Sequence, residues 1–541
     1  MGHRLTVVVA FALALAPVLP LGCSKFSSDE PTPSNSDVDG STATDANAPV
    51  MGTPDRGLTI VVGDPKATSF VVQGDSLAVP VKLTRRPSST GPVDVTVAKL
   101  PADVTADPLT IPEGATEATL TLRAKPTSVQ GGPSILDITA IEKSPRGTGA
   151  ATKLSAFVRG KAGQLDTTFG TNGLVRHAVG SGKNALGRDL VVLDDDRLLA
   201  VGECATNACV VRSSANGVLD STYGTGGVGA VAVGLIGQAI ADPSGAVVVS
   251  GNGGANSLKI GRLTDKGQPD ATFGGGTGSD LGTRQFVPPG AGPPEQQRTS
   301  LAIRKDGTLA IGFAHIHQTP TLGLALLSPA GAVVTSFGTN GSTEGRALLD
   351  GTPPAIGIRA SGAIWAVSLG NGICYGDQVD GSTGKPDPTF GGDGTYVVCG
   401  LSPRWGLGAA VALSDGSIVL AFRSVSNVLV GKWVPDGKRL DLTWGSGGVA
   451  TLSETGLPSV SVDKKGLILV MLAGTGALRF LRLNVNGALD SSFGQAGAVT
   501  HSFGTNQEIV RVLVQKDGRI VVLGTEEFAD GSDMTLSRYW N

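Results

Sequence analysis

Residues 165–173 read Leu-Asp-Thr-Thr-Phe-Gly-Thr-Asn-Gly, and closely similar stretches recur six more times along the chain. The later copies are LDSTYGTGG from 219, PDATFGGG from 269, VVTSFGTNG from 333, PDPTFGGDG from 386, LDLTWGSGG from 440 and LDSSFGQAG from 489. Their aromatic residues are 49 to 64 positions apart, and a glycine follows each of them. This regular spacing indicates an internal structural repeat.

Each copy except the fourth has an aspartate three residues before its aromatic residue, and the fourth has Val334 there. We expect the aspartate to accept hydrogen bonds from the backbone amides ahead of it, and the aromatic ring to fill the space between neighbouring units. The glycines can adopt backbone angles closed to other residues. These structural anchors are Asp166, Phe169, Asp220, Tyr223, Asp270, Phe273, Phe337, Asp387, Phe390, Asp441, Trp444, Asp490 and Phe493.

The sequence between consecutive motifs predicts four short β-strands. One strand follows the motif, as at 174–179, and a second leads to a tight turn such as Asp306-Gly307 or Asp517-Gly518. A third strand leaves the turn, and a fourth, as at 477–483, runs into the next motif. Four strands in about 50 residues are typical of a propeller blade. Because a closed ring needs no capping repeats, residues 163–541 are predicted to form a seven-bladed β-propeller.

The motif and its period resemble the delta-60 repeat family of bacterial envelope proteins, in which a G-x-L-D-x-x-F-G-x-x-G pattern recurs. The resemblance covers about 380 residues. It implies a propeller in a secreted or surface protein, and it brings no established activity and no catalytic residues.

Residues 57–160 alternate short apolar runs with turn residues about every ten positions, from 58–62 to 153–158. Some seven short strands in about 100 residues favour an antiparallel β-sandwich of immunoglobulin-like type. This segment contains neither Cys nor His. Its expected role, by analogy of fold, is that of a spacer or an adhesion domain. The whole folded part is therefore expected to be all-β, a sandwich followed by a propeller.

The N-terminus reads as an export signal. Residues 1–22 combine Arg4 with an apolar run that ends in Leu-Gly before Cys23, a pattern typical of a secretory signal peptide. The stretch 19–23 resembles the lipobox of bacterial lipoproteins, although Pro20 stands where the family usually has leucine. The resemblance implies lipidation of Cys23 and an outer-membrane or cell-surface location. The alternative is an ordinary signal peptide with a chance cysteine.

Residues 23–56 are rich in Ser, Thr, Asp, Pro and Ala and almost lack large apolar side chains. Such a segment cannot bury enough apolar surface to offset its chain entropy, so we expect a disordered tether. The whole chain has 43 basic and 46 acidic residues and no run of Lys or Arg. The chain therefore has no excess or cluster of positive charge of the kind that binds nucleic acid. We also expect no cofactor and a monomeric chain.

Four cysteines remain besides Cys23. Cys204 and Cys209 flank a short hairpin, where we expect a local disulfide. Cys374 and Cys399 are then expected to form a second disulfide, between neighbouring blades. Metal binding by these cysteines is the alternative, but the sequence contains no C-x-x-C motif.

His315 and His317 lie near the end of a predicted strand, where alternation places both rings on one side. Two such imidazoles could bind a metal or another ligand. We expect His315 and His317 to lie on one rim of the propeller. The Pro-rich loop 286–298, the hairpin 204–209 and the acidic stretch 526–533 are expected on the same rim. This rim is the candidate binding face, and solvated loops without a ligand are the alternative.

These features favour a lipid-anchored cell-envelope protein whose propeller binds a protein or a glycan without catalysis. One alternative is an extracytoplasmic hydrolase or lyase with a metal- or carboxylate-based site on the propeller face. Another is a purely structural spacer. The sequence contains no Ser-His-Asp set, no phosphate-binding glycine loop and no HExxH helix that would favour a specific enzyme class.

Overall fold

The computed structural model describes residues 57–541 except 88, 145–146, 180–184, 205–206, 235, 255–256, 288–298, 316–320, 340–341, 348–354, 371–372, 391–394, 401–405, 414, 425, 437–438, 474–477, 502–506 and 530. In this described part, every regular element is a β-strand except the 3-10 turn η1 (Gly278–Asp280). The expected all-β class is therefore confirmed.

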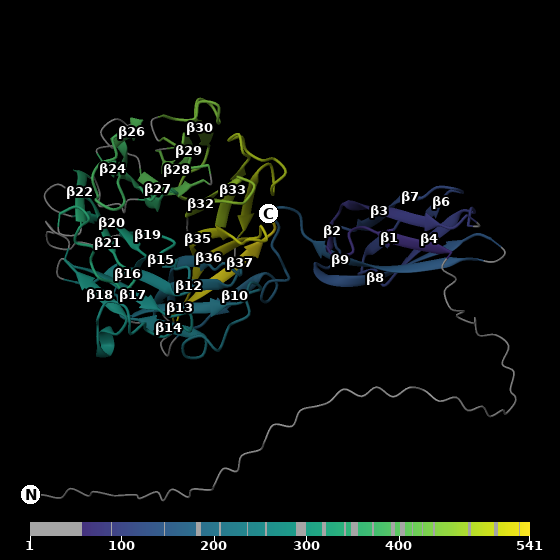
Figure 1. Cartoon of the computed structure of the whole chain (residues 1–541), viewed down its shortest axis with the longest axis horizontal. Coiled ribbons are helices and arrows are strands. Elements are labelled where there is room, and N and C mark those ends of the chain that lie inside the picture. Colours follow the sequence, from purple (N-terminus) through teal and green to yellow (C-terminus); the bar gives the residue numbers. More distant parts are fainter. Residues whose placement is uncertain are drawn as a thin grey trace, which may run out of the picture. The chain divides into compact units, whose positions relative to one another are not determined.

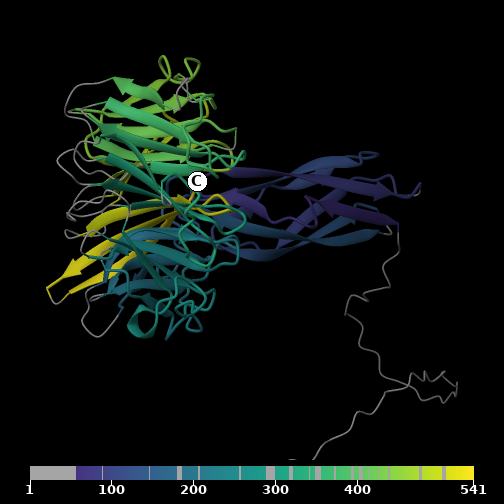
Figure 2. The same ribbon diagram turned by 60° about the vertical axis from the view of Figure 1, so that its left-hand side comes forward.

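Residues 57–159 form two sheets around one hydrophobic core, with strand orders β1-β3-β7-β5 and β2-β9-β8-β4-β6. Figure 2 shows the two sheets face to face. Alternate residues of each strand enter the core, as in β1, where Leu58, Ile60 and Val62 are buried. The strands are β1 (Leu58–Val62), β2 (Ser69–Val72), β3 (Ser76–Arg85), β4 (Val93–Ala98), β5 (Val104–Ala106), β6 (Leu109–Ile111), β7 (Glu117–Ala124), β8 (Gly131–Glu142) and β9 (Gly149–Arg159).

One pairing corrects the expectation of a purely antiparallel sandwich. Strand β2 runs parallel to β9, with Ser69 opposite Ala156 and Val72 opposite Arg159. The chain places β2 beside the last strand of the domain rather than beside its sequence neighbours, and alternation of apolar residues does not reveal strand direction.

The described residues from 174 onward form seven four-stranded antiparallel sheets. Their first strands are β11 (Ala185–Val192), β15 (Ile236–Ala241), β19 (Thr299–Ile303), β23 (Ala355–Ile358), β27 (Gly406–Ala412), β31 (Leu457–Val462) and β35 (Gln507–Val514). Their second strands are β12 (Leu198–Cys204), β16 (Val247–Asn252), β20 (Leu309–His315), β24 (Ile364–Gly370), β28 (Ile418–Arg423), β32 (Ile468–Ala473) and β36 (Ile520–Phe528).

Six of the third strands lead directly into a motif, whereas the seventh, β37, pairs with the start of the first motif through Leu165 and Tyr539. The fourth strands follow the motifs. The third strands are β13 (Asn207–Ser213), β17 (Leu258–Leu263), β21 (Thr321–Leu327), β25 (Ile373–Val379), β29 (Val428–Trp433), β33 (Leu478–Leu483) and β37 (Gly531–Tyr539). The fourth strands are β14 (Val228–Val231), β18 (Thr283–Phe286), β22 (Ser342–Ala347), β26 (Thr395–Gly400), β30 (Val449–Leu452), β34 (Ala498–His501) and β10 (Leu174–His177).

The first strands of these sheets form a closed ring. Each contacts the first strand of the next sheet in chain order, from β11 to β35, and β35 contacts β11 again. Figure 1 shows the sheets fanned around this common centre. Such a radial arrangement of four-stranded sheets is that of a β-propeller.

The closing sheet joins the two ends of the ring. Its order is β10-β37-β36-β35, and β10 pairs antiparallel with β37, placing Leu174 opposite Ser537 and His177 opposite Met534. The strand after each motif therefore completes the sheet that precedes it, rather than beginning the next unit as the sequence suggested. A repeat in sequence has no intrinsic starting point, so its phase relative to the sheets becomes visible only in the structure.

Candidate functional site

The seven motif aromatics are core residues between neighbouring sheets. The side chains of the seven are each at most 3% exposed. Phe493, for example, packs in one cluster with Met471 of β32 and Ile509 of β35. Their role is therefore to hold adjacent sheets together, as the motif predicts, and they are closed to a ligand.

The motif aspartates order the turns through one carboxylate oxygen. In six copies, Oδ1 accepts hydrogen bonds from the backbone amide and the hydroxyl of the residue two positions later. The pairs are Asp166–Thr168, Asp220–Thr222, Asp270–Thr272, Asp387–Thr389, Asp441–Thr443 and Asp490–Ser492. The hydroxyl of Thr389 lowers the pKa of Asp387 in this way.

The second carboxylate oxygen meets a polar or basic side chain from the preceding third strand. Arg212 donates to Asp220 over 2.8 Å, eight residues along the chain. The equivalent pairs are Arg262–Asp270, Lys432–Asp441, Arg482–Asp490 and, through Gln378, Gln378–Asp387. Two of these guanidinium groups also lie over a motif ring, at 4.4 Å for Arg212 on Tyr223 and 4.5 Å for Arg482 on Phe493. Arg538, on β37, lies in the same way 4.7 Å from the centre of the Phe169 ring. We call each pair of a motif aspartate with an arginine or lysine of the third strand an Asp–base clasp.

The fourth motif has an apolar pair instead of a clasp. Val334 replaces the aspartate, and the residue eight positions earlier is Leu326. The backbone bond is retained, because the amide of Val334 donates to the carbonyl of Leu326 over 3.0 Å. The joint replacement of both partners was the available sequence signal for the clasp. Sequence reasoning missed the clasp because the basic residue lies outside the motif, on the strand that precedes it.

The first motif receives its base from the other end of the chain. Arg538 Nε donates to Asp166 Oδ2 over 2.8 Å, and both side chains are fully buried. Arg519 Nη1 lies 3.2 Å from the same oxygen. Burial lowers the pKa of Arg538 to about 10, which leaves the guanidinium charged at neutral pH. This clasp connects the first motif to β37 and so helps to close the ring.

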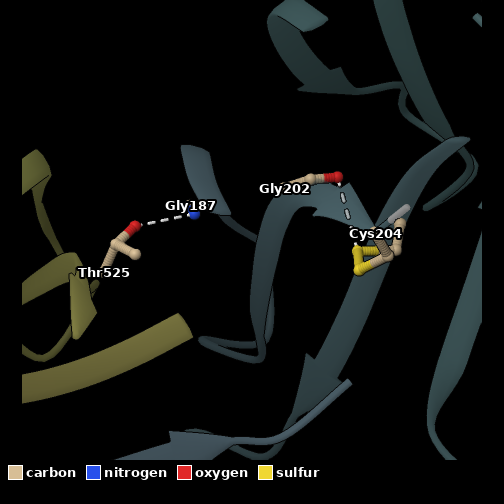
Figure 3. Close-up of a disulfide and its surroundings, with 5 residues drawn as sticks. Gly187, Gly202, Cys204 and Thr525 are labelled. Atoms are coloured by element: carbon tan, nitrogen blue, oxygen red, sulfur yellow. Dashed lines mark hydrogen bonds between the residues drawn. A yellow bond between two sulfur atoms is a disulfide. The ribbon is translucent and has the colours of Figure 1, made fainter. Parts of the chain in front are cut away.

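The hairpin at Cys204 and Cys209 contains the expected disulfide (Figure 3). It joins adjacent strands β12 and β13, where Cys209 lies opposite Gly202. Nearby, the amide of Gly187 donates to Thr525 Oγ1 over 2.9 Å, which links β11 to β36 of the closing sheet. The disulfide thus stabilises a hairpin beside the ring closure.

Cys374 and Cys399 lie directly opposite each other on β25 and β26. They belong to one sheet, so the expected bridge between neighbouring blades is corrected to a pairing within a single sheet. The reason is again that the strand after a motif completes the preceding sheet. Their backbone register is compatible with a disulfide, and the bond itself stays a prediction.

The expected rim is only partly described. Register pairs such as Ala185 opposite Cys204 place the starts of the first strands beside the ends of the second strands. The loop 288–298, Asp530 and His317 lie outside the described residues, as does Cys23. His315 ends β20, and the structure describes its backbone alone. A ligand site at His315 and His317 therefore stays a prediction.

Two histidines lie on opposite sides of the closing sheet. His177 Nε2 is 3.1 Å from Ser213 Oγ, and burial lowers the pKa of His177 to about 4. The ring of His501 meets Tyr539 edge-on at 5.7 Å between centroids. His177 is therefore a hydrogen-bonded core residue.

A groove of about 900 Å³ lies between the fourth strand of one sheet and the third strand of the next. It lies along β30 and β33 and is lined by Glu454, Arg479 and several hydroxyl and amide side chains. We call it the β30–β33 groove. Two smaller cavities measure about 630 Å³, at the hairpin turns after β11, β15 and β19, and about 450 Å³, beside the disulfide. Within the described residues, no three His, Cys, Asp or Glu side chains are grouped closely enough to hold a metal ion.

No family model matches the chain, and no curated protein matches it in sequence. Among solved structures, the β-propeller domain of the Trilobed protease from Pyrococcus furiosus matches over 66% of this chain and 96% of its own, at 10% identity and a TM-score of 0.37. NanB sialidase from Streptococcus pneumoniae matches over 84% and 95%, at 10% identity and a TM-score of 0.34. Prolyl oligopeptidase B from Galerina marginata matches over 81% and 55%, at 10% identity and a TM-score of 0.33. These likenesses assign no activity to this chain.

Proposed function

We propose that this protein is a lipid-anchored cell-envelope protein whose propeller binds a protein or a glycan without catalysis. The observation that supports a binding role is the β30–β33 groove, which has a volume of about 900 Å³ and polar groups along its walls. A cleft of this size suits a small or medium-sized ligand. The motif aromatics cannot supply such a site, because their rings are buried between the sheets.

The proposed architecture has an immunoglobulin-like sandwich over residues 57–160 and a seven-bladed propeller over 163–541. The two-sheet core of the first segment supports the former. The ring of contacts among the first strands, closed by β10 and β37, supports the latter. A closed propeller is a rigid support, and binding loops and grooves are commonly displayed on such scaffolds.

The proposed anchor is the lipid on Cys23, followed by the tether to residue 56. Support comes from the sequence alone, namely the apolar run before Leu-Gly-Cys and the polar composition that follows. In the described residues, no helix reaches the length and hydropathy that a membrane crossing requires.

Metabolic labelling with a palmitate analogue tests the anchor. The full chain, expressed with its own leader, is expected to take up the label and to sediment with membranes. A Cys23→Ser variant is the matched control and should lose both properties. An unlabelled wild-type protein in the soluble fraction would exclude the lipid anchor.

Binding is tested with the purified full chain immobilised on a surface. A glycan array and a solubilised envelope extract are applied to it, and heat-denatured protein serves as the control. Saturable retention of a glycan or a protein by the folded chain is expected. Failure of the folded chain to retain anything beyond the denatured control would contradict the binding role.

A further inference from the structure

We propose that the β30–β33 groove is a binding site for a neutral oligosaccharide. This inference rests on the proposed binding function and narrows it to one ligand class at one place in the ring.

The groove is open because β30 is an edge strand. Strand β30 pairs with β29 on one side only, and in the described sheets no strand pairs with its other side. The floor of the groove is apolar, with Leu481 and Leu483 of β33 and Leu489 of the following motif. The face of a sugar ring carries C–H groups that can pack on such a floor.

An ion pair stands at one end of the groove. Glu454 Oε1 accepts a hydrogen bond from Arg479 Nη2, and Arg479 Nη1 donates to Thr500 Oγ1 over 2.8 Å. The Glu454 side chain is 18% exposed and that of Arg479 is 38% exposed. Their contact raises the pKa of Arg479. Both groups are reachable from solvent, and each retains hydrogen-bonding capacity for a ligand.

The charges and polar groups favour a neutral ligand with many hydroxyls. The carboxylate and the guanidinium cancel, so the groove has no net charge to attract an anion or a cation. The carboxylate accepts hydrogen bonds and the guanidinium donates them, and a sugar hydroxyl can do both. Further hydroxyl and amide groups line the same walls, from Ser446, Thr451, Ser453, Asn486 and Gln495.

The edge of β30 is poorly suited to an added peptide strand. The strand has four residues, and the carbonyl of Val449 already accepts a hydrogen bond from the amide of Ser446. Strand addition needs a row of free backbone donors and acceptors. Recognition by side chains therefore fits this groove better than recognition of a peptide backbone.

The groove differs from its counterpart beside the disulfide. That smaller cavity occupies the equivalent position along β14 and is lined by Cys204, Cys209 and Pro269, with no charged side chain. The residue equivalent to Arg479 on β17 is Lys259, which pairs with Asp280 over 2.6 Å outside these cavities. This ion pair provides a matched control.

The test uses the full chain and an array of neutral oligosaccharides built from hexoses, deoxyhexoses and N-acetylhexosamines, with sialylated glycans and random peptides as competing arms. The neutral oligosaccharide with the strongest signal is then titrated by calorimetry. Glu454→Gln and Arg479→Met are each expected to weaken its binding by about tenfold or more, which corresponds to the loss of one charged hydrogen bond. Asp280→Asn should leave the affinity within about twofold.

A third variant separates binding from folding. Thr451→Val keeps the shape of an exposed side chain and removes only its hydroxyl, so it should weaken binding about threefold to tenfold with an unchanged melting temperature. Neutral glycan binding that survives all three groove variants would overturn the groove site and leave the proposed binding function intact. Wild-type protein that retains only charged glycans, only peptides or only envelope proteins would overturn the ligand class. Wild-type protein that retains nothing would overturn the proposed function as well.

Discussion

The Asp166–Arg538 clasp should contribute more to the stability of the ring than any clasp that does not close it. Both side chains are fully buried, and they connect segments at opposite ends of the repeat region. Replacing Asp166 with valine leaves the Arg538 guanidinium in the core without its carboxylate. Breaking a buried ion pair in this way costs about 3–5 kcal/mol.

The fourth motif suggests a compensating change. Leu326 and Val334 occupy the equivalent positions there without any charge. The double variant Asp166→Val with Arg538→Leu copies that pair and removes both charges. Its cost should be lower than that of Asp166→Val alone, with a coupling energy of about 2 kcal/mol. Recovery is expected to be partial, because Arg538 Nη1 also donates to the carbonyl of Ala215 over 2.6 Å.

The coupling energy is measured by thermal unfolding of four proteins, namely the wild type, Asp166→Val, Arg538→Leu and the double variant. A ring of about 380 residues gains roughly 0.8 kcal/mol of unfolding entropy per degree, so a cost of 4 kcal/mol lowers the melting temperature by about 5 °C. Hydrogen exchange of the β10 amides should increase in Asp166→Val and slow again in the double variant. The control is the same set of variants at Arg212 and Asp220, a partly exposed clasp whose two residues are close in sequence. Its variants should lower the free energy of unfolding by less.

Two outcomes would refute this reasoning. One is a double variant whose cost equals the sum of the two single costs, since the residues would then act independently. The other is an Asp166→Val protein that melts within about 1 °C of wild type.

Three further predictions follow from individual residues. Burial lowers the pKa of His177 to about 4, while the pKa in the unfolded chain is near 6.5, so between these pH values the unfolded chain binds one more proton than the folded chain. The free energy of unfolding should therefore fall by up to about 3 kcal/mol as the pH decreases from 6.5 toward 4. Denaturant titrations of His177→Gln should show a weaker dependence on pH. Gly487 has a φ of +85°, and a Cβ there would lie 2.8 Å from the Trp444 side chain. Gly487→Ala should therefore destabilise the folded protein by about 2–4 kcal/mol, and an unchanged melting temperature would contradict this packing. Peptide mapping without reduction should recover Cys374 and Cys399 in one disulfide-linked fragment, and recovery of both as free thiols would exclude that bridge.

Much of the fold could be predicted because its determinants are local and repeated. The motif from Leu165 recurs with its aromatic residue and glycines, and the turns between first and second strands carry their own signals, such as Asp517-Gly518. Each signal acts within a few residues, so it is visible in one unit and reinforced by the others. The all-β class and the radial sheets follow from this repetition.

The phase of the sheets and the direction of β2 could not be obtained in this way. Whether the strand after a motif joins the sheet before it or after it depends on long-range pairing, such as that of β10 with β37. The same uncertainty of phase led to the wrong sheet assignment for Cys399. Parallel pairing of β2 with β9 likewise joins segments that are far apart in sequence.

The β30–β33 groove was not predicted because its charged pair, Glu454 and Arg479, is not part of the repeated motif. Glu454 follows an edge strand and Arg479 lies on the third strand of the next sheet, and no motif connects them in the sequence. The sequence instead directed attention to the rim around His315 and His317, where variation in loop length is most visible. A site that lies between two units is found only when the units have been placed side by side.

The closure of the ring by β10 and β37 is the central structural claim, and an engineered cross-link tests it most directly. Arg176 lies opposite Thr535 in this pairing, so the double variant Arg176→Cys with Thr535→Cys should form a disulfide in nearly all folded molecules, seen as a linked fragment after proteolysis without reduction. The control Arg176→Cys with Thr451→Cys pairs β10 with an edge strand of another sheet and should not cross-link. A folded Arg176→Cys, Thr535→Cys protein whose two introduced thiols remain free under oxidising conditions would contradict the closed ring.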